Sequence, residues 1–226
     1  MDNRLQKAPL MRIFKLKVAS DKLTEFSEIG QHNLTTSIAK EPGTLAMYST
    51  SSPDEPSTFY IAEIYENTEA YEKHVASEHF QSFASFAAEH LTDRLVYQLH
   101  PQWLKEKAEA ISAQGKDSLT VKLAEVDVKT ESNQAFRDIV VKEMAAAMEK
   151  ETGVLAMYAA TLADNPASWR FFEIYADNAA YEKHRQTQHF KTYIEQTAEM
   201  VQTKKLLTLT ADILVNQGGL FFDLFL

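Results

Sequence analysis

Apolar and polar positions alternate along residues 10–18, where Phe14, Leu16 and Val18 share one face. This period of two is typical of a β-strand. Residues 119–128 alternate in a similar way and predict a second copy of the strand.

The segment after the first strand has a helical period, and its apolar positions are Leu23, Phe26, Ile29 and Leu34. Ser20 or Asp21 can cap the N-terminus of this helix. Pro42 disfavours helical geometry at Glu41, and Gly43 suits a tight exit, so the helix is expected to end before Glu41.

Residues 44–50 and 58–65 predict a hairpin, because a turn-rich stretch of Ser, Pro, Asp and Glu separates them. One face of the second strand consists of Phe59, Ile61, Glu63 and Tyr65, and the other of Tyr60, Ala62 and Ile64. Both faces are largely apolar. We therefore expect both to be covered.

Residues 70–91 predict a further helical region with a break near Ser77, capped by Asn67 or Thr68. A last strand is expected over residues 94–99. The element order is then β-α-β-β-α-β, the ferredoxin-like arrangement, in which both helices lie on one face of a four-stranded antiparallel sheet.

The chain carries this pattern twice. Residues 43–48 return as 153–158 and residues 70–74 as 180–184, at a constant spacing of 110 (153 − 43 and 184 − 74). That period exceeds the roughly 20–50 residues of solenoid and propeller repeats, so each copy is a whole domain. The last strand of the second copy is expected over residues 204–209.

The expected domains are residues 9–106 and 117–216, followed by an apolar tail over 217–226. The linker between the domains is long enough to cross from one to the other, so each copy is expected to cover the second sheet face of the other. The tail has many large apolar groups and is expected to be docked.

Composition and charge exclude several classes of protein. The formal net charge of −9 disfavours nucleic acid and anionic lipid as partners. The absence of cysteine excludes disulfides, thiolate nucleophiles and iron–sulfur clusters. Residues 1–9 do not resemble a secretory leader, and no run is long enough for a membrane span, so a cytoplasmic protein with a small-molecule partner is expected.

The motifs Glu63-Ile64-Tyr65, Ala70 to His74 and Ser77 to Phe80 resemble the signature of the antibiotic biosynthesis monooxygenase family. Members of that family typically form homodimers whose sheets pack face to face into a barrel, with a ligand cavity between each sheet and its helices. The resemblance implies an α+β fold in which two tandem ferredoxin-like domains form an intrachain dimeric α+β barrel. It also implies a cofactor-independent monooxygenase of a small aromatic or quinol-like substrate.

The superfamily also contains isomerases, heme-degrading enzymes and members without known activity, so other functions stay open. An isomerase of a small dicarbonyl or phosphorylated metabolite would need a basic anchor, for which Arg170 is the candidate. A non-catalytic small-molecule-binding or stress-response barrel is the other alternative. Heme degradation is disfavoured, because the stations that hold a tryptophan and an axial histidine in those relatives hold His74 and Ala84 here.

The catalytic candidates are two helical pairs, Tyr71 with His74 and Tyr181 with His184, each three residues apart on one helix face. A neutral imidazole there can exchange a proton with a phenolic substrate near pH 7. The alternative is that each imidazole binds a neighbouring loop and orients its helix.

His79 and His189 are interpreted as structural, and no metal site is expected because the two histidines of each copy are five residues apart with no third ligand recurring. The sequence has no Gly-rich dinucleotide motif and no Gly-x-Ser-x-Gly elbow, so no cofactor is expected.

Glu63 and Glu173 fall on an otherwise apolar strand face, where a carboxylate either pairs with a cation or keeps a raised pKa and acts as a base. Lys15 is a candidate cation for Glu63, but the second copy has Glu125 at that position. The expected substrate-binding residues are the aromatic and acidic groups of the hairpins, which suit a flat ligand: Tyr48, Phe59, Glu63, Tyr65, Tyr158, Trp169, Glu173 and Tyr175.

The two hairpins differ, because Tyr60-Ile61-Ala62 becomes Arg170-Phe171-Phe172. One of the two pockets is therefore expected to be altered or filled.

Overall fold

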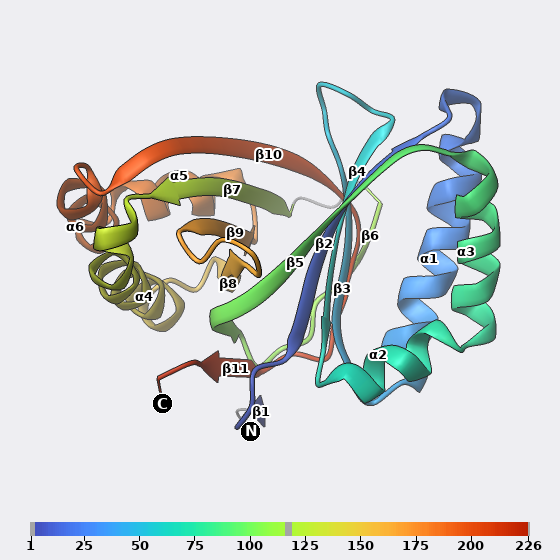
Figure 1. The fold of residues 1–226 in the computed structure, drawn as a ribbon, viewed down its shortest axis with the longest axis horizontal. Helices are drawn as coiled ribbons and strands as arrows, with labels where there is room; N and C mark the ends of the chain where they lie inside the picture. Colours follow the sequence, from blue (N-terminus) through green and yellow to red (C-terminus); the bar gives the residue numbers. More distant parts are fainter. Residues whose placement is uncertain (1–2, 116–118, 226) are drawn as a thin grey trace.

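A computed structural model describes residues 3–115 and 119–225 and contains two halves of the same design (Figure 1). The N-terminal half consists of β2 (Leu10–Val18), α1 (Leu23–Lys40), β3 (Thr44–Ser51), β4 (Thr58–Tyr65), α2 (Thr68–Val75), α3 (Glu78–His90) and β5 (Leu91–Glu106). The C-terminal half consists of β7 (Thr120–Val128), α4 (Asn133–Lys150), β8 (Val154–Leu162), β9 (Ser168–Tyr175), α5 (Asn178–Gln186), α6 (Gln188–Thr197) and β10 (Val201–Asn216). Short strands β1 (Asn3–Arg4), β6 (Ser112–Gln114) and β11 (Leu220–Asp223) complete the sheet.

Two long strands close the sheet into one barrel. β5 pairs with β2 through its first part and with β8 through its second part. β10 pairs in the same way with β7 and with β3. In Figure 1 both strands run from one half of the molecule to the other, and the three helices of each half lie outside the strands. The predicted intrachain barrel of two ferredoxin-like domains is confirmed.

The last strand of each copy is much longer than the expected residues 94–99 and 204–209. The extra residues lie against the other copy: Leu99 to Glu106 pair with β8, and Thr210 to Asn216 with β3. Their pairing partner is supplied by tertiary structure, which the local pattern of one domain does not reveal.

Both faces of β4 are buried, as its two-sided apolar pattern predicts. Every residue of β4 is buried. Tyr60, Ala62 and Ile64 belong to the apolar core inside the barrel, whereas Phe59 and Ile61 pack with residues of α1 and α3 outside it. The apolar core inside the barrel therefore fixes the two halves relative to each other.

The helix boundaries follow local chemistry except at the starts of α1 and α4, which have no side-chain cap. Asn67 accepts a hydrogen bond from the Ala70 amide at the start of α2, and Ser77 accepts one from the Phe80 amide at the start of α3, where the expected break lies. α1 instead begins after a short 3₁₀ turn without a side-chain cap, so the expected capping by Ser20 or Asp21 is wrong.

Gly43 recurs as Gly153 because the loop before the hairpin touches the following helix. A Cβ atom at Gly43 would lie 2.5 Å from the Cβ of Ala70, and one at Gly153 would lie 2.6 Å from that of Ala180. These are closer than any non-bonded carbon contact, so a side chain is excluded at both positions.

The tail is docked through β11, which pairs with β5 and buries Leu220 and Phe222, while Phe225 is exposed. The expected start of the second domain at residue 117 and the last residue of the tail, 226, lie outside the described residues. Within the described chain no helix is long and apolar enough to cross a membrane.

Candidate functional site

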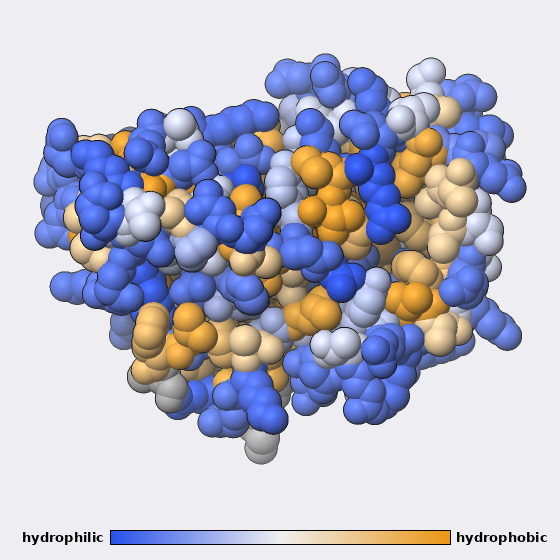
Figure 2. Space-filling view, viewed as in Figure 1, coloured by the Kyte–Doolittle hydropathy of each residue, from blue (hydrophilic) through white to orange (hydrophobic). Residues whose placement is uncertain are grey.

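A cavity of about 390 Å³ lies in the N-terminal half between the strands and helices α1 and α3. Apolar side chains reach the surface over this region (Figure 2). Most of the cavity wall is apolar and aromatic, including Phe14, Phe26, Ile61, Phe80 and Phe83. The polar lining comes from Asn33, Ser49, Glu63, Tyr71, Thr92, Asp93 and Arg94. This is the composition of a small-ligand site, with apolar walls and few polar groups.

Glu63 is the buried acid of this cavity, whereas Asp93 is exposed. Burial raises its pKa to about 7, against the opposing effect of a hydrogen bond from the Tyr65 hydroxyl and of the positive charges of Arg12 and Arg94. The Tyr65 hydroxyl donates to Glu63 Oε2 over 3.0 Å. The carboxyl is therefore poised to take or release a proton near neutral pH.

The suggested Lys15 partner for Glu63 does not fit the sheet register. β2 places Arg12 opposite Glu63 and Lys15 opposite Tyr60. The Arg12 guanidinium lies 4.0 Å from the centre of the Tyr71 ring, on the cavity wall, and its Nε donates to Gln98. Glu63 thus has cations nearby, but Tyr65 is the residue that donates a hydrogen bond to it.

Asn33 reaches the same cavity from α1. Its side chain is 1% exposed, and Oδ1 has no hydrogen-bond partner. A buried amide oxygen without a donor is costly, by about 1–3 kcal/mol. A ligand hydroxyl in the cavity would satisfy it.

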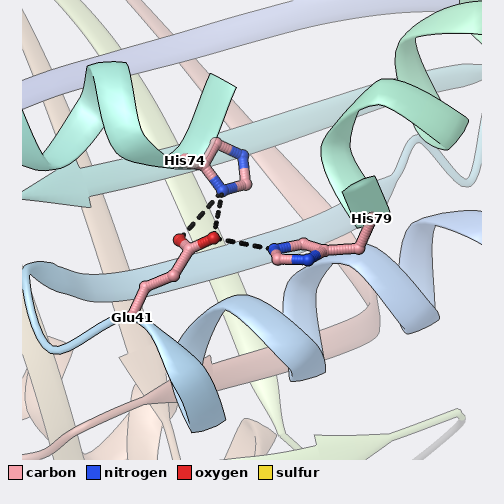
Figure 3. Close-up of side chains that lie close together, drawn as sticks. All are labelled: Glu41, His74 and His79. Carbon is pink, nitrogen blue, oxygen red and sulfur yellow. Dashed lines mark hydrogen bonds and ion pairs between the residues drawn. The ribbon is translucent and has the colours of Figure 1, made fainter. Parts of the chain in front are cut away.

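His74 lies on the neighbouring helix α2 and is fully buried, and it does not line the cavity. Its Nδ1 lies 3.0 Å from Glu41 Oε2 and 3.2 Å from Ser37 Oγ, and His79 Nε2 lies 2.7 Å from Glu41 Oε1. Figure 3 shows the Glu41 carboxylate between the two rings, which come from α2 and α3. Burial lowers the pKa of His74 and outweighs the opposing effect of Glu41. The neutral ring is therefore favoured.

The C-terminal half repeats this arrangement of two histidines around one carboxylate, with Glu151 in the place of Glu41. His184 Nδ1 lies 2.9 Å and His189 Nε2 2.7 Å from Glu151 Oε1. One group is added: Glu143, at the position of Asn33, lies 3.6 Å from His184 Nε2. Burial and the charges of Glu173 and Glu151 raise the pKa of Glu143 to about 9.

Three positions that line the cavity carry larger side chains in the C-terminal half. At the spacing of 110, Gly30 becomes Val140, Ile61 becomes Phe171 and Ala84 becomes Ile194. Phe171 stacks on Trp169, with ring centres 5.7 Å apart, and both are buried. The difference between the hairpins thus coincides with a difference between the two helix-side interiors.

Tyr48 and Tyr158 lie on the opposite face of the sheet, inside the barrel. Their hydroxyl oxygens are 2.6 Å apart, and the Tyr158 hydroxyl donates to Glu106 Oε1 over 2.5 Å. Asn216 Nδ2 donates to the Tyr48 hydroxyl. Burial raises the pKa of Glu106 to about 7. The structure therefore separates these two tyrosines from the cavity.

The other expected binding residues lie on the helix side. Phe59 packs against Phe26, with ring centres 4.6 Å apart, and Trp169 donates from Nε1 to Asn133. In the C-terminal half the Tyr175 hydroxyl donates to Glu173 Oε2 over 2.7 Å, and Lys122 Nζ lies 3.9 Å from the centre of the Tyr181 ring. Each half therefore brings its Glu, two Tyr and His together. In the N-terminal half, Glu63 and Tyr71 of this set line the cavity.

The sequence reasoning did not single out Asn33, Arg94 or Glu41. Glu41 had a usable signal, because it recurs as Glu151 at the period of 110. The histidine pairs of both copies also gain a third group that their spacing did not suggest. They are on separate helices, so the helix break, rather than a common face, brings them to one carboxylate. Asn33 had no such signal, since its counterpart is Glu143.

Two ferredoxin-like units that close one barrel within a single chain, with a carboxyl-bearing cavity under the helices, define an intrachain dimeric α+β barrel protein. The family model for antibiotic biosynthesis monooxygenases matches the chain twice, over residues 9–85 and 120–196. The chain belongs to this family. No curated protein matches it.

Several solved structures resemble this chain over nearly its full length. A "putative monooxygenase" from Lactobacillus acidophilus NCFM is 33% identical with a TM-score of 0.90, covering 96% of this chain and 100% of that one. Another from Fusobacterium nucleatum is 25% identical with a TM-score of 0.89, covering 97% and 99%. An anthrone oxidase-like protein, 16% identical with a TM-score of 0.61 and covering 94% and 95%, shares the fold.

Proposed function

We propose that the N-terminal cavity is the active site of a cofactor-independent monooxygenase for a small phenolic or quinol-like substrate. The observation that carries the proposal is Glu63, a buried carboxyl whose pKa is raised to about 7, on the wall of an aromatic cavity. A carboxyl with this pKa is partly ionised at neutral pH, and its ionised form can accept a phenolic proton.

In this mechanism ionised Glu63 takes the hydroxyl proton of the substrate, and Asn33 Oδ1 accepts a hydrogen bond from a hydroxyl group of the bound molecule. The resulting electron-rich anion reduces dioxygen directly. One oxygen atom enters the ring and the other leaves as water, so one substrate and one O₂ give one quinone and one H₂O. The substrate supplies all the electrons, and no added reductant is needed.

His74 and Glu41 then have a positioning role, since they fix α2 behind Tyr71. The C-terminal half supplies half of the barrel but has larger side chains at three of the equivalent cavity positions, so we assign one active site to the chain.

The test is oxygen consumption by the purified protein with a panel of quinols and polycyclic phenols, without added cofactor. Glu63→Gln should lower kcat at least about a hundredfold, because glutamine cannot take the proton. The matched variant Glu173→Gln in the C-terminal half should retain turnover. Equal losses in both variants, or wild-type turnover in Glu63→Gln, would refute the assignment.

Arg94 keeps an isomerase as the second candidate, because a cation on the cavity wall can anchor an anionic dicarbonyl or phosphorylated metabolite. The sequence reasoning placed that anchor at Arg170, but Arg170 lies over the ring of Tyr97 and donates to Ser168. Substrate isomerisation without oxygen uptake, lost in Arg94→Gln, would favour this function over oxygenation.

A further inference from the structure

Four ionisable side chains lie close together in the C-terminal half. Glu143 is on α4, Glu151 directly follows that helix, and His184 and His189 are on α5 and α6. Glu143, Glu151 and His184 are 5%, 8% and 2% exposed, and His189 is 19% exposed. Glu143, His184 and His189 each place a ligand atom within 4.8 Å of the others. Such a cluster of imidazoles and carboxylates does not occur by burial preference, since acidic groups are rarely buried without a partner.

Glu151 determines which ring nitrogens are free. Its Oε1 lies within hydrogen-bond distance of His184 Nδ1 and of His189 Nε2. A carboxylate accepts and does not donate, so those two nitrogens carry the protons. His184 Nε2 is then left with a lone pair in the metal-free protein, and His189 offers one ring nitrogen within 4.8 Å of the ligand atoms of His184 and Glu143. A carboxylate behind an imidazole is also the usual way in which proteins orient a metal-binding histidine.

Glu143 faces one of these lone pairs. Its Oε1 is 3.6 Å from His184 Nε2, which is too long for a hydrogen bond, and it has no hydrogen-bond partner. Two ligands bound at about 2.0–2.2 Å to one tetrahedral cation are about 3.3–3.6 Å apart. The observed separation therefore suits a shared cation.

We propose that Glu143, His184 and His189 bind one first-row divalent cation of the Zn²⁺ type, with Glu151 orienting the His184 imidazole through Nδ1. The ion would balance the two buried carboxylates and tie α4, α5 and α6 together. This site is distinct from the cavity and does not depend on the proposed reaction. In the N-terminal half Asn33 replaces Glu143, so the second buried carboxylate is missing there and that half serves as a matched control.

The full chain, without a histidine tag, is stripped with a chelator and titrated with Zn²⁺ by calorimetry and with Co²⁺ by visible absorption. We expect about one ion per chain and a Zn²⁺-dependent rise in Tm. Glu143→Gln and His189→Gln should each weaken binding at least about tenfold and remove the rise in Tm. His79→Gln, the counterpart of His189→Gln, should bind like the wild type.

Glutamine is close in shape to Glu143 and keeps hydrogen-bonding groups, so the variant is expected to fold; if it does not, His189→Gln decides the question. No Zn²⁺ or Co²⁺ binding by the wild-type chain would overturn the proposal. Wild-type affinity in the folded Glu143→Gln and His189→Gln variants would also overturn it, and so would loss of binding in His79→Gln. Either result would place the ion elsewhere.

Discussion

The Tyr48 and Tyr158 hydroxyl oxygens lie 2.6 Å apart inside the barrel, although the two residues are 110 positions apart in the chain. They are equivalent residues of the two copies. Their neighbours Glu106 and Asn216 are also equivalent, but one is an acid and the other an amide. This difference gives a directed chain of donors from Asn216 through Tyr48 and Tyr158 to Glu106, which two identical copies would not provide.

Tyr158→Phe should lower the free energy of unfolding by about 1–3 kcal/mol, because it removes the hydroxyl that donates to buried Glu106. Tyr48→Phe should also destabilise the protein. The double variant should lose less than the sum of the two, since the residues share one hydrogen bond. Urea denaturation measures all three, and strictly additive losses would show that the hydroxyls act independently.

Gly30→Ala should stabilise the protein by about 0.5–1 kcal/mol, because alanine favours the helix and a Cβ atom at this position meets nothing within 4 Å. Gly30→Val should copy Val140 of the other half and reduce the cavity, so KM should rise with little loss of folded protein. Thermal unfolding and steady-state kinetics measure the two effects. Val140→Ala is the control, and an equal change in its KM would argue against a single cavity.

The pKa of Glu63 gives the protein a pH-dependent stability. The value is raised from 4.5 to about 7 on folding, so the folded state binds more protons between these values. The contribution of Glu63 is therefore most favourable below about pH 4.5 and declines, by about 3 kcal/mol, as the pH rises to about 7. Glu63→Gln should remove this part of the slope when unfolding is measured across that range. Parallel curves for wild type and variant would mean that Glu63 is not desolvated.

His74→Gln and His184→Gln should each destabilise the protein by about 1–3 kcal/mol, since each disturbs a buried bond to Glu41 or Glu151. Turnover per folded molecule should fall more for His74→Gln, because α2 also carries Tyr71 on the cavity wall. Kinetics corrected by circular dichroism would separate the effects. Equal losses of turnover would contradict the assignment of one active site.

Ending the chain after Gly219 should destabilise it by about 3–5 kcal/mol. The change removes the buried Leu220 and Phe222 side chains and the Leu220 amide that donates to Glu106 Oε2. Tm and light scattering measure the loss and any aggregation. Leu224→Ala, at a half-exposed position, should stay within about 0.5 kcal/mol of the wild type; an unchanged truncated protein would mean that docking contributes nothing.

The hydrophobic pattern by itself determined the type and order of the main elements of each copy, though not the length of its last strand, because strand and helix periods and turn residues act locally. The duplication could also be recognised from the sequence, because local packing requires the same residue at equivalent positions. Gly43 and Gly153, for example, recur where a helix lies too close for a side chain. The two-sided strands also required a cover for the second sheet face, and the repeat was the nearest candidate.

Only the tertiary structure decided where the candidate site lies. It placed Tyr48 and Glu63 on opposite faces of one hairpin, extended β5 and β10 onto the other copy, and brought Asn33 to the acid from a helix thirty positions away. Distances between side chains on different elements, and the burial that raises the pKa of Glu63, depend on packing. Packing is a property of the whole chain, so two copies of the same pattern can differ inside, as the buried Val140 and Phe171 differ from Gly30 and Ile61.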